Sequence, residues 1–157
     1  MDRHTEREQR MEISSDNLVI ERTFDASPKD VFEAWIVPQR MVKWGGPEHH
    51  PMIAADGDPH PGGQWWATLQ QADGDEQLEQ SGKYTEVRSP EHMAFTFGWD
   101  GVPGERKETL IDIDLEEVGN GRTRMIFRQG PFDTVANRDE HREGWSSAFD
   151  RLDAYLH

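Results

Sequence analysis

The chain has 157 residues, a formal net charge of -14 at pH 7 and no cysteine. That length suits one domain with a full hydrophobic core. The absence of cysteine excludes disulfides, thiolate catalysis and Cys-ligated zinc. The acidic balance argues against binding to nucleic acid, whose phosphates require a basic surface. Apolar runs are too short to span a membrane, so we expect no membrane partner and a cytoplasmic location.

The N-terminal residues 1–14 alternate in charge without an apolar face and predict a flexible charged tail. Residues 15–157 predict a single domain. Its first strand follows the tail, because apolar side chains there recur at a period of two. Those side chains are Leu18, Ile20 and Phe24.

Two short helices are predicted after this strand. Ser27 can cap a helix N-terminus, and Pro28 suits the first helical position. Pro38 ends this helix and can open a second one, predicted over residues 39–44.

From Met52 the apolar period is two, which predicts six further strands. Asp73–Gly74 predicts a hairpin turn, Gly82 a β-bulge, and Gly119–Asn120–Gly121 a three-residue loop. The side chains expected on the inner face are Trp65, Ala67, Leu69, Met93, Phe95, Phe97, Trp99, Ile111, Ile113, Leu115, Thr123, Met125 and Phe127.

The chain ends in a predicted helix over residues 137–156, whose apolar stripe comprises His141, Trp145, Ala148, Phe149, Leu152 and Leu156. Antiparallel strands followed by one amphipathic helix predict an α+β architecture, with the helix laid across one face of the sheet.

The last hairpin has a register that strand parity fixes. Inward residues must face inward residues, so the paired numbers sum to an even value. With a three-residue loop, Glu116 should lie opposite Arg124, and Asp112 opposite Arg128.

The ordered set of motifs resembles the branch of the START-like (SRPBCC) superfamily named after the activator of heat-shock protein 90 ATPase. The resemblance covers nearly the whole domain. It rests on these residues: Arg22 through Pro28, Val31, Trp35, Trp44 through Pro47, Pro61–Gly62–Gly63, Gly82, Ser89–Pro90–Glu91, Phe95, Thr123, Gly144–Trp145 and Leu152.

The resemblance implies a helix-grip fold, in which a curved antiparallel sheet of about seven strands encloses a cavity against the long C-terminal helix. Similar proteins act as co-chaperones, bind hydrophobic metabolites, confer resistance to a natural product or perform cyclase-like chemistry, so the resemblance supports the fold more than the function. The family's common Trp-Trp-Gly-Pro is Trp44–Gly45–Gly46–Pro47 here. One wall of the usual pocket entrance is therefore expected to be absent.

Two polar residues are candidates for contact with a ligand. Arg22 shares parity with the inward residues of its strand, so it either meets a ligand anion or reaches a surface carboxylate. His141 lies one turn before Trp145; it either serves as an acid–base group or bonds a neighbouring carbonyl. Gly144, next to Trp145, indicates either close approach of the sheet or space for a ligand. The full set of candidate ligand-binding residues is Arg22, Trp35, Trp44, Trp65, Phe95, Phe97, Met125, His141, Trp145 and Phe149.

No metal or cofactor is predicted. Glu48, His49 and His50, with Asp56, Asp58 and His60, match no standard zinc or calcium spacing and predict a solvated loop. The acidic run Glu108, Asp112, Asp114 and Glu116 predicts a solvated outer sheet face.

Three functions compete. The first is non-catalytic binding of a small, largely hydrophobic molecule in the sheet–helix cavity, because aromatic and Met side chains converge there. The second is an enzyme, cyclase- or hydrolase-like, acting on such a molecule with His141 as the acid–base group. The third is a stress-related co-chaperone acting through its surface. Trp66, predicted on the outer face, marks either a weak homodimer contact or a lone surface aromatic.

Overall fold

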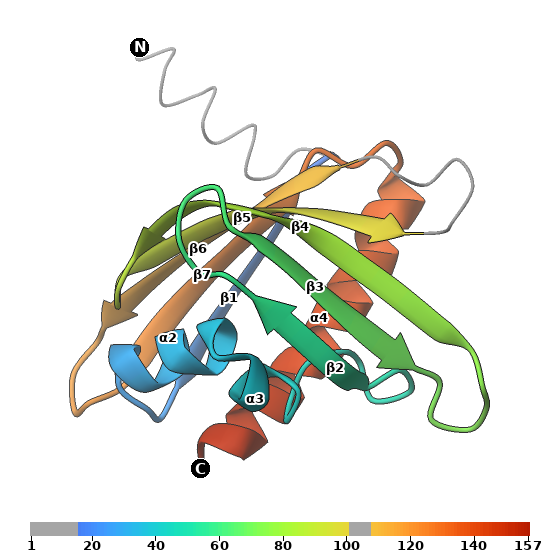
Figure 1. Cartoon of the computed structure of the whole chain (residues 1–157). Helices are drawn as coiled ribbons and strands as arrows, with labels where there is room; N and C mark the ends of the chain where they lie inside the picture. The colour runs from blue at the N-terminus through green and yellow to red at the C-terminus, as the bar shows by residue number, and fades with distance from the viewer. Residues whose placement is uncertain (1–15, 101–107) are drawn as a thin grey trace.

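The computed structural model describes residues 16–100 and 108–157, so the predicted tail lies outside the described residues. Seven antiparallel strands form one sheet in the order β1-β7-β6-β5-β4-β3-β2. The sheet curves around α4, and α2 and α3 lie at its open side (Figure 1). This is the predicted helix-grip fold. Its elements are β1 (Leu18–Phe24), α2 (Pro28–Ile36), α3 (Pro38–Met41), β2 (Met52–Gly57), β3 (Gln64–Gln70), β4 (Gln77–Arg88), β5 (His92–Asp100), β6 (Thr109–Glu117), β7 (Thr123–Gly130) and α4 (Val135–Leu156).

The helix starts follow the predicted capping chemistry. The Ser27 hydroxyl accepts a hydrogen bond from the Asp30 N–H at 3.2 Å, and Pro28 occupies the first turn of α2. α3 begins at Pro38 and ends at Met41, so the predicted helix over residues 39–44 is shorter and begins one residue earlier.

α4 begins two residues before the predicted start at Asn137 because Thr134 caps it. The Thr134 hydroxyl accepts from the Asn137 N–H at 3.0 Å. Thr134 has extended backbone angles, which suit an N-cap. The apolar stripe did not reveal this start, since the first turn of α4 carries no buried side chain.

Replacing Thr134 with alanine should lower the free energy of unfolding by about 1 kcal/mol, because one N-terminal N–H of α4 loses its acceptor. Urea denaturation measures the change. Thr134→Ser retains the hydroxyl and should keep most of the stability. Equal losses in the two variants would show that the methyl group, and not the cap, is responsible.

The strands keep the predicted parity. All six residues predicted to face inward from β6 and β7 are buried, with exposed fractions between 0% and 5%. Asp112 pairs with Arg128 and Glu116 with Arg124, which confirms the predicted register of the last hairpin. Asn120 adopts a left-handed backbone with φ of 54° in the connecting loop.

The irregularity in β4 lies elsewhere than predicted. The register with β5 shifts between Tyr84 and Glu86, not at Gly82. Gly82 instead permits close packing, because a Cβ atom there would overlap the Thr96 carbonyl and approach the indole nitrogen of Trp65.

Aromatic rings fill the middle of the fold. The Trp35 ring centroid lies 4.9 Å from that of Trp44, 5.8 Å from Trp145 and 5.9 Å from Phe149. The Trp35 indole N–H has no hydrogen-bond partner within the described chain and lies inside this cluster. Trp145 is anchored, since its N–H donates to the Gln129 Oε1 at 2.8 Å. This packing confines free space to the periphery of the core.

Among the described helices, none is long and apolar enough to cross a membrane.

Candidate functional site

An open groove of about 710 Å³ lies between α4 and the inner face of the sheet. The first half of α4 forms one wall, and strands β2 to β5 form the other. The loop after α3 borders the groove as well. The side chains from the sheet and α3 are Met41, Met52, Leu69, Leu78, Gln80, Phe97 and Trp99. The residues from α4 and the turn before it are Asp133, Thr134, Ala136, Asn137, Glu140, His141, Glu143, Gly144, Trp145 and Ala148.

The groove exists because α4 buries only its second half. The buried side chains of α4 are Ala148, Phe149 and Leu152, whereas residues 135–147 are half-buried or exposed. A Cβ atom built on Gly144 would meet no heavy atom within 4 Å beyond its own helix. Of the two explanations for this glycine, close approach of the sheet is therefore excluded, and Gly144 borders open space.

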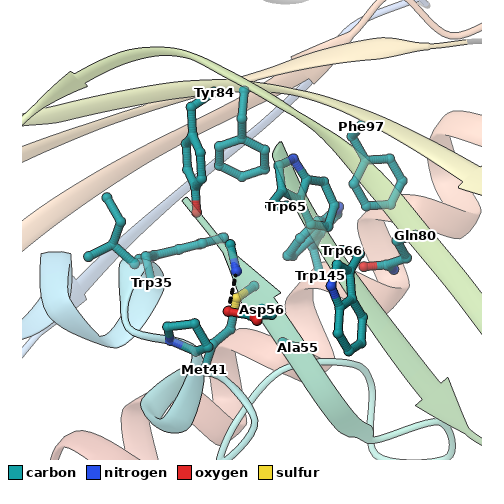
Figure 2. Close-up of a pocket in the computed structure, with 14 residues that line it drawn as sticks. Trp35, Met41, Ala55, Asp56, Trp65, Trp66, Gln80, Tyr84, Phe97 and Trp145 are labelled. Carbon is teal, nitrogen blue, oxygen red and sulfur yellow. Dashed lines mark hydrogen bonds between the residues drawn. The ribbon is translucent and has the colours of Figure 1, made fainter. Parts of the chain in front are cut away.

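A much smaller space of about 30 Å³ lies deeper, between β2 to β5 and α2 (Figure 2). Figure 2 shows the Tyr84 hydroxyl pointing toward Trp35. Burial raises the pKa of Tyr84 to about 12, so this hydroxyl stays neutral at physiological pH. Four residues border both spaces: Met41, Gln80, Phe97 and Trp145.

The structure divides the predicted ligand-binding residues into three groups. Phe97, His141 and Trp145 border the groove, and Trp35, Trp65 and Phe95 border the smaller space. Fully buried positions in the packed core hold Trp44, Met125 and Phe149, each 0% exposed, and neither space touches them.

Arg22 borders neither space. Its guanidinium donates to the Asp150 carboxylate at 2.9 Å and to the Ser146 carbonyl at 3.2 Å. Both partners lie on α4. Arg22 therefore ties β1 to this helix, as expected for a guanidinium that reaches a surface carboxylate.

His141 borders the groove with both ring nitrogens engaged. The Trp99 indole N–H donates to His141 Nε2 at 3.0 Å, so Nε2 carries no proton. His141 Nδ1 then holds the proton and donates it to the Asn137 carbonyl at 2.9 Å. This arrangement fixes a neutral imidazole and turns its nitrogens away from acid–base work.

The loop after α3 closes one end of the groove. Gly46 needs to be glycine, because its φ is 75° and a Cβ atom would collide with the His50 carbonyl. A side chain at Gly45 would collide with Met52. Met52 therefore occupies the space next to Gly45, the position that departs from the family's common motif.

The sequence did not indicate the polar group on the groove floor. Gln80 is only 7% exposed and borders both spaces. It pairs with Ala67 on one side and Trp99 on the other, which places it on the inner face. The available signal was strand parity, since Gln80 shares the parity of the inward-facing Leu78 and Tyr84.

A second polar cluster lies on the outer face of the sheet around His92. The His92 side chain is buried, with Nδ1 at 2.8 Å from Asp114 Oδ1 and Nε2 at 3.0 Å from Glu86 Oε2. Arg128 bonds the other Asp114 oxygen at 3.1 Å. The sequence predicted a solvated outer face for Asp112 and Asp114. In the structure these carboxylates also hold a buried imidazole. That partner follows from the β5–β6 register, which sets His92 opposite Asp114.

The same cluster contains the described residues closest to a metal-ligand set. Ligand atoms of Glu86, His92 and Asp112 lie within 4.8 Å of one another. Burial alone would lower the pKa of His92, but hydrogen bonds to Glu86 and Asp114 raise it above its ordinary value, and the charge of Asp112 adds to that rise. A protonated imidazole satisfies both facing carboxylates without a metal.

Trp66 is 47% exposed, as predicted, and alternates with the buried Trp65, although it also borders the smaller space (Figure 2). We predict that this exposed surface forms a weak homodimer, because an exposed tryptophan often marks a contact surface. Sedimentation of the wild type and of Trp66→Ser at equal concentration should show a dimer fraction in the wild type alone. A wild type that stays monomeric at high concentration would leave Trp66 as a lone surface aromatic.

Comparison with known proteins places this geometry in a family. The family model described as "Activator of Hsp90 ATPase homolog 1-like protein" matches residues 25–157. No curated protein sequence matches the chain.

Solved structures share the fold. The AHSA1 protein from Silicibacter pomeroyi is 28% identical with a TM-score of 0.76, over 89% of this chain and 96% of that one. A protein from Rhodobacter sphaeroides is 23% identical with a TM-score of 0.76, over 91% and 93%. CalU16 from Micromonospora echinospora is 19% identical with a TM-score of 0.62, over 89% and 75%. With a family match across most of its length and the START-like fold, the chain belongs to the activator of Hsp90 ATPase homolog 1-like family.

Proposed function

We propose that this protein binds a small, largely apolar molecule in the groove between the sheet and α4, without catalysing a reaction on it. The groove itself carries the proposal. Its volume of about 710 Å³ falls within the range of roughly 300–1,000 Å³ typical of small-molecule sites. A family that shares a fold does not share one ligand, so the argument rests on this site.

The walls of the groove suit an apolar ligand. Met52, Leu69, Leu78, Phe97 and Trp99 form a continuous apolar surface on the sheet. Methionine and aromatic side chains adapt to varied apolar shapes, which favours uptake of a hydrophobic body. Gly144 leaves room on the opposite wall.

Binding without catalysis is favoured by the state of His141. A general base needs a free lone pair within reach of its substrate. The lone pair of Nε2 accepts the Trp99 N–H, and the proton on Nδ1 is given to a backbone carbonyl. Using Nε2 as a general base would require breaking the hydrogen bond from Trp99.

The test is a titration with N-phenylnaphthylamine, an uncharged probe that fluoresces in apolar surroundings. Burial of about 300 Å² of apolar probe surface contributes about 7.5 kcal/mol, which corresponds to a dissociation constant of about 3 µM. Saturable fluorescence enhancement with one site per chain supports the proposal. An absence of saturable binding would refute it and leave the surface-acting co-chaperone role as the better explanation.

A further inference from the structure

Among the described residues, the ionisable side chains that border the groove are three carboxylates and three imidazoles, the latter from His49, His50 and His141. Asp133, Glu140 and Glu143 all stand on the α4 side. Of the described residues that border the groove, none is Lys or Arg. The wall facing the apolar strands is therefore acidic, in a chain whose formal net charge is already -14.

Four arginines lie on or beside α4, and none of them borders the groove. Arg138 is bound to Asp139, and Arg142 donates to the Val19 carbonyl. Arg22 is bound to Asp150 and the Ser146 carbonyl. Arg151 donates to the carbonyls of Gly45 and Gly46, below the end of the groove. None of the four is therefore placed to receive an anionic ligand.

Glu140 and Glu143 are available to a ligand. They are three residues apart on α4, so their side chains neighbour each other on one face. Neither carboxylate forms an ion pair with a residue in the described ranges 16–100 and 108–157. Asp133, at the start of the helix, accepts from the Asn137 side chain at 3.1 Å.

The dipole of α4 is too small to make the net charge of this groove wall positive. A helix N-terminus is equivalent to about half a positive charge. Three carboxylates border the same wall, one of them beside that N-terminus. His141 Nε2 accepts a hydrogen bond from the Trp99 indole N–H.

The floor supplies a second, independent indication of a ligand. Gln80 is 93% buried, with an exposed fraction of 7%, and its side-chain amide has no hydrogen-bond partner within the described chain. It borders both the groove and the smaller space behind it. This amide can therefore exchange hydrogen bonds with a molecule bound in the groove.

We propose that the groove selects apolar molecules that carry a cationic amine and rejects those that carry a carboxylate. The ammonium group lies against Glu140 and Glu143, the apolar body covers the sheet wall, and Gln80 meets the ligand at the floor. This inference rests on the proposed function, since it names the class of ligand for the same groove.

Displacement of N-phenylnaphthylamine by three ligands with one alkyl chain tests the inference. Decylamine, decanol and decanoate share a ten-carbon skeleton and carry a cationic, a neutral and an anionic head group at neutral pH. We expect decylamine to displace the probe at a concentration at least about tenfold lower than decanoate, with decanol between them. Added salt should narrow the difference, because the acidic wall is exposed.

Two double variants separate the groove from the overall charge. Glu140→Gln with Glu143→Gln should lose most of the preference for decylamine. Glu79→Gln with Glu117→Gln changes the net charge equally at exposed sites outside the groove and should keep it.

Each remaining outcome counts against a specific claim. Probe binding with equal displacement by decylamine and decanoate overturns the charge selection and leaves the proposed function intact. Equal loss of preference in both double variants assigns it to net charge and also overturns the inference. A wild type that does not bind the probe overturns the proposed function itself.

Discussion

Replacing Gly144 with leucine is expected to weaken N-phenylnaphthylamine binding by at least about tenfold. A Cβ atom at this position meets no heavy atom within 4 Å beyond its own helix, so the new side chain can extend into the groove. Displacing about 60 Å² of apolar probe contact corresponds to about 1.5 kcal/mol, which is roughly tenfold in affinity. Fluorescence titration measures the effect.

The fold should survive this substitution, because leucine favours a helix interior over glycine by up to about 1 kcal/mol. Urea denaturation should therefore show equal or greater stability. Ala154→Leu is the matched control, since Ala154 is exposed on α4 and does not border the groove. Unchanged affinity in a folded Gly144→Leu variant would mean that the probe binds elsewhere.

Replacing His92 with alanine is expected to lower the free energy of unfolding by about 3 kcal/mol. The imidazole is buried between Glu86 and Asp114, so its loss leaves carboxylates facing one another. Arg128 remains to offset part of this repulsion. Because Glu86 and Asp114 are about half exposed, water limits the loss to the lower end of what a broken buried pair costs.

The His92 cluster should also make stability depend on pH. The folded state holds the proton more tightly than the unfolded chain, because the pKa of His92 is raised above 6.5 by Glu86 and Asp114 in spite of burial. The stabilisation is then complete below pH 6.5 and is lost as pH rises through the higher folded-state pKa. Asp112 and Arg128 also face this cluster, and both are present in the wild type and in His92→Ala, so their contribution is the same in the two proteins compared.

Urea denaturation across neutral and mildly alkaline pH measures this dependence. The free energy of unfolding of the wild type should fall as pH rises. In His92→Ala the part of this pH dependence that comes from His92 should be absent. His60→Ala removes an imidazole that is 66% exposed and paired with Asp58, so it serves as the control with little change. A pH profile that is the same in His92→Ala and the wild type would show that His92 is not protonated on folding.

Local patterns were sufficient for the sheet. Alternation in β6 and β7 identified six inward residues correctly, because a strand with one buried face must keep its parity, but it left out Thr109 and Gln129 at the strand ends. The three-residue loop then fixed the pairing of Glu116 with Arg124. Ser27 and Pro28 likewise set the start of α2, since capping depends on a few neighbouring atoms.

Local patterns were insufficient for α4. Its apolar stripe predicted one continuous buried face from His141 to Leu156, but only Ala148, Phe149 and Leu152 are buried. The stripe has the same period whether or not a strand lies opposite it. The curvature of the sheet decides which part of the stripe has a strand opposite it. That curvature depends on strand pairings such as β4 with β5, where the register shifts.

Sequence alone therefore determined the order of the elements, the faces of the strands, the register of the last hairpin and the membership of the START-like superfamily. The tertiary structure alone decided which polar groups meet outside the last hairpin and the predicted helix cap. It placed Arg22 against Asp150, bonded His141 to Trp99, placed Gln80 on the groove floor and buried His92 among carboxylates. The physical reason is the range of the interactions. Parity and capping act within a few residues, whereas Arg22 and Asp150, Trp99 and His141, and His92 and Asp114 are 22 to 128 positions apart and meet only in the folded sheet and helix.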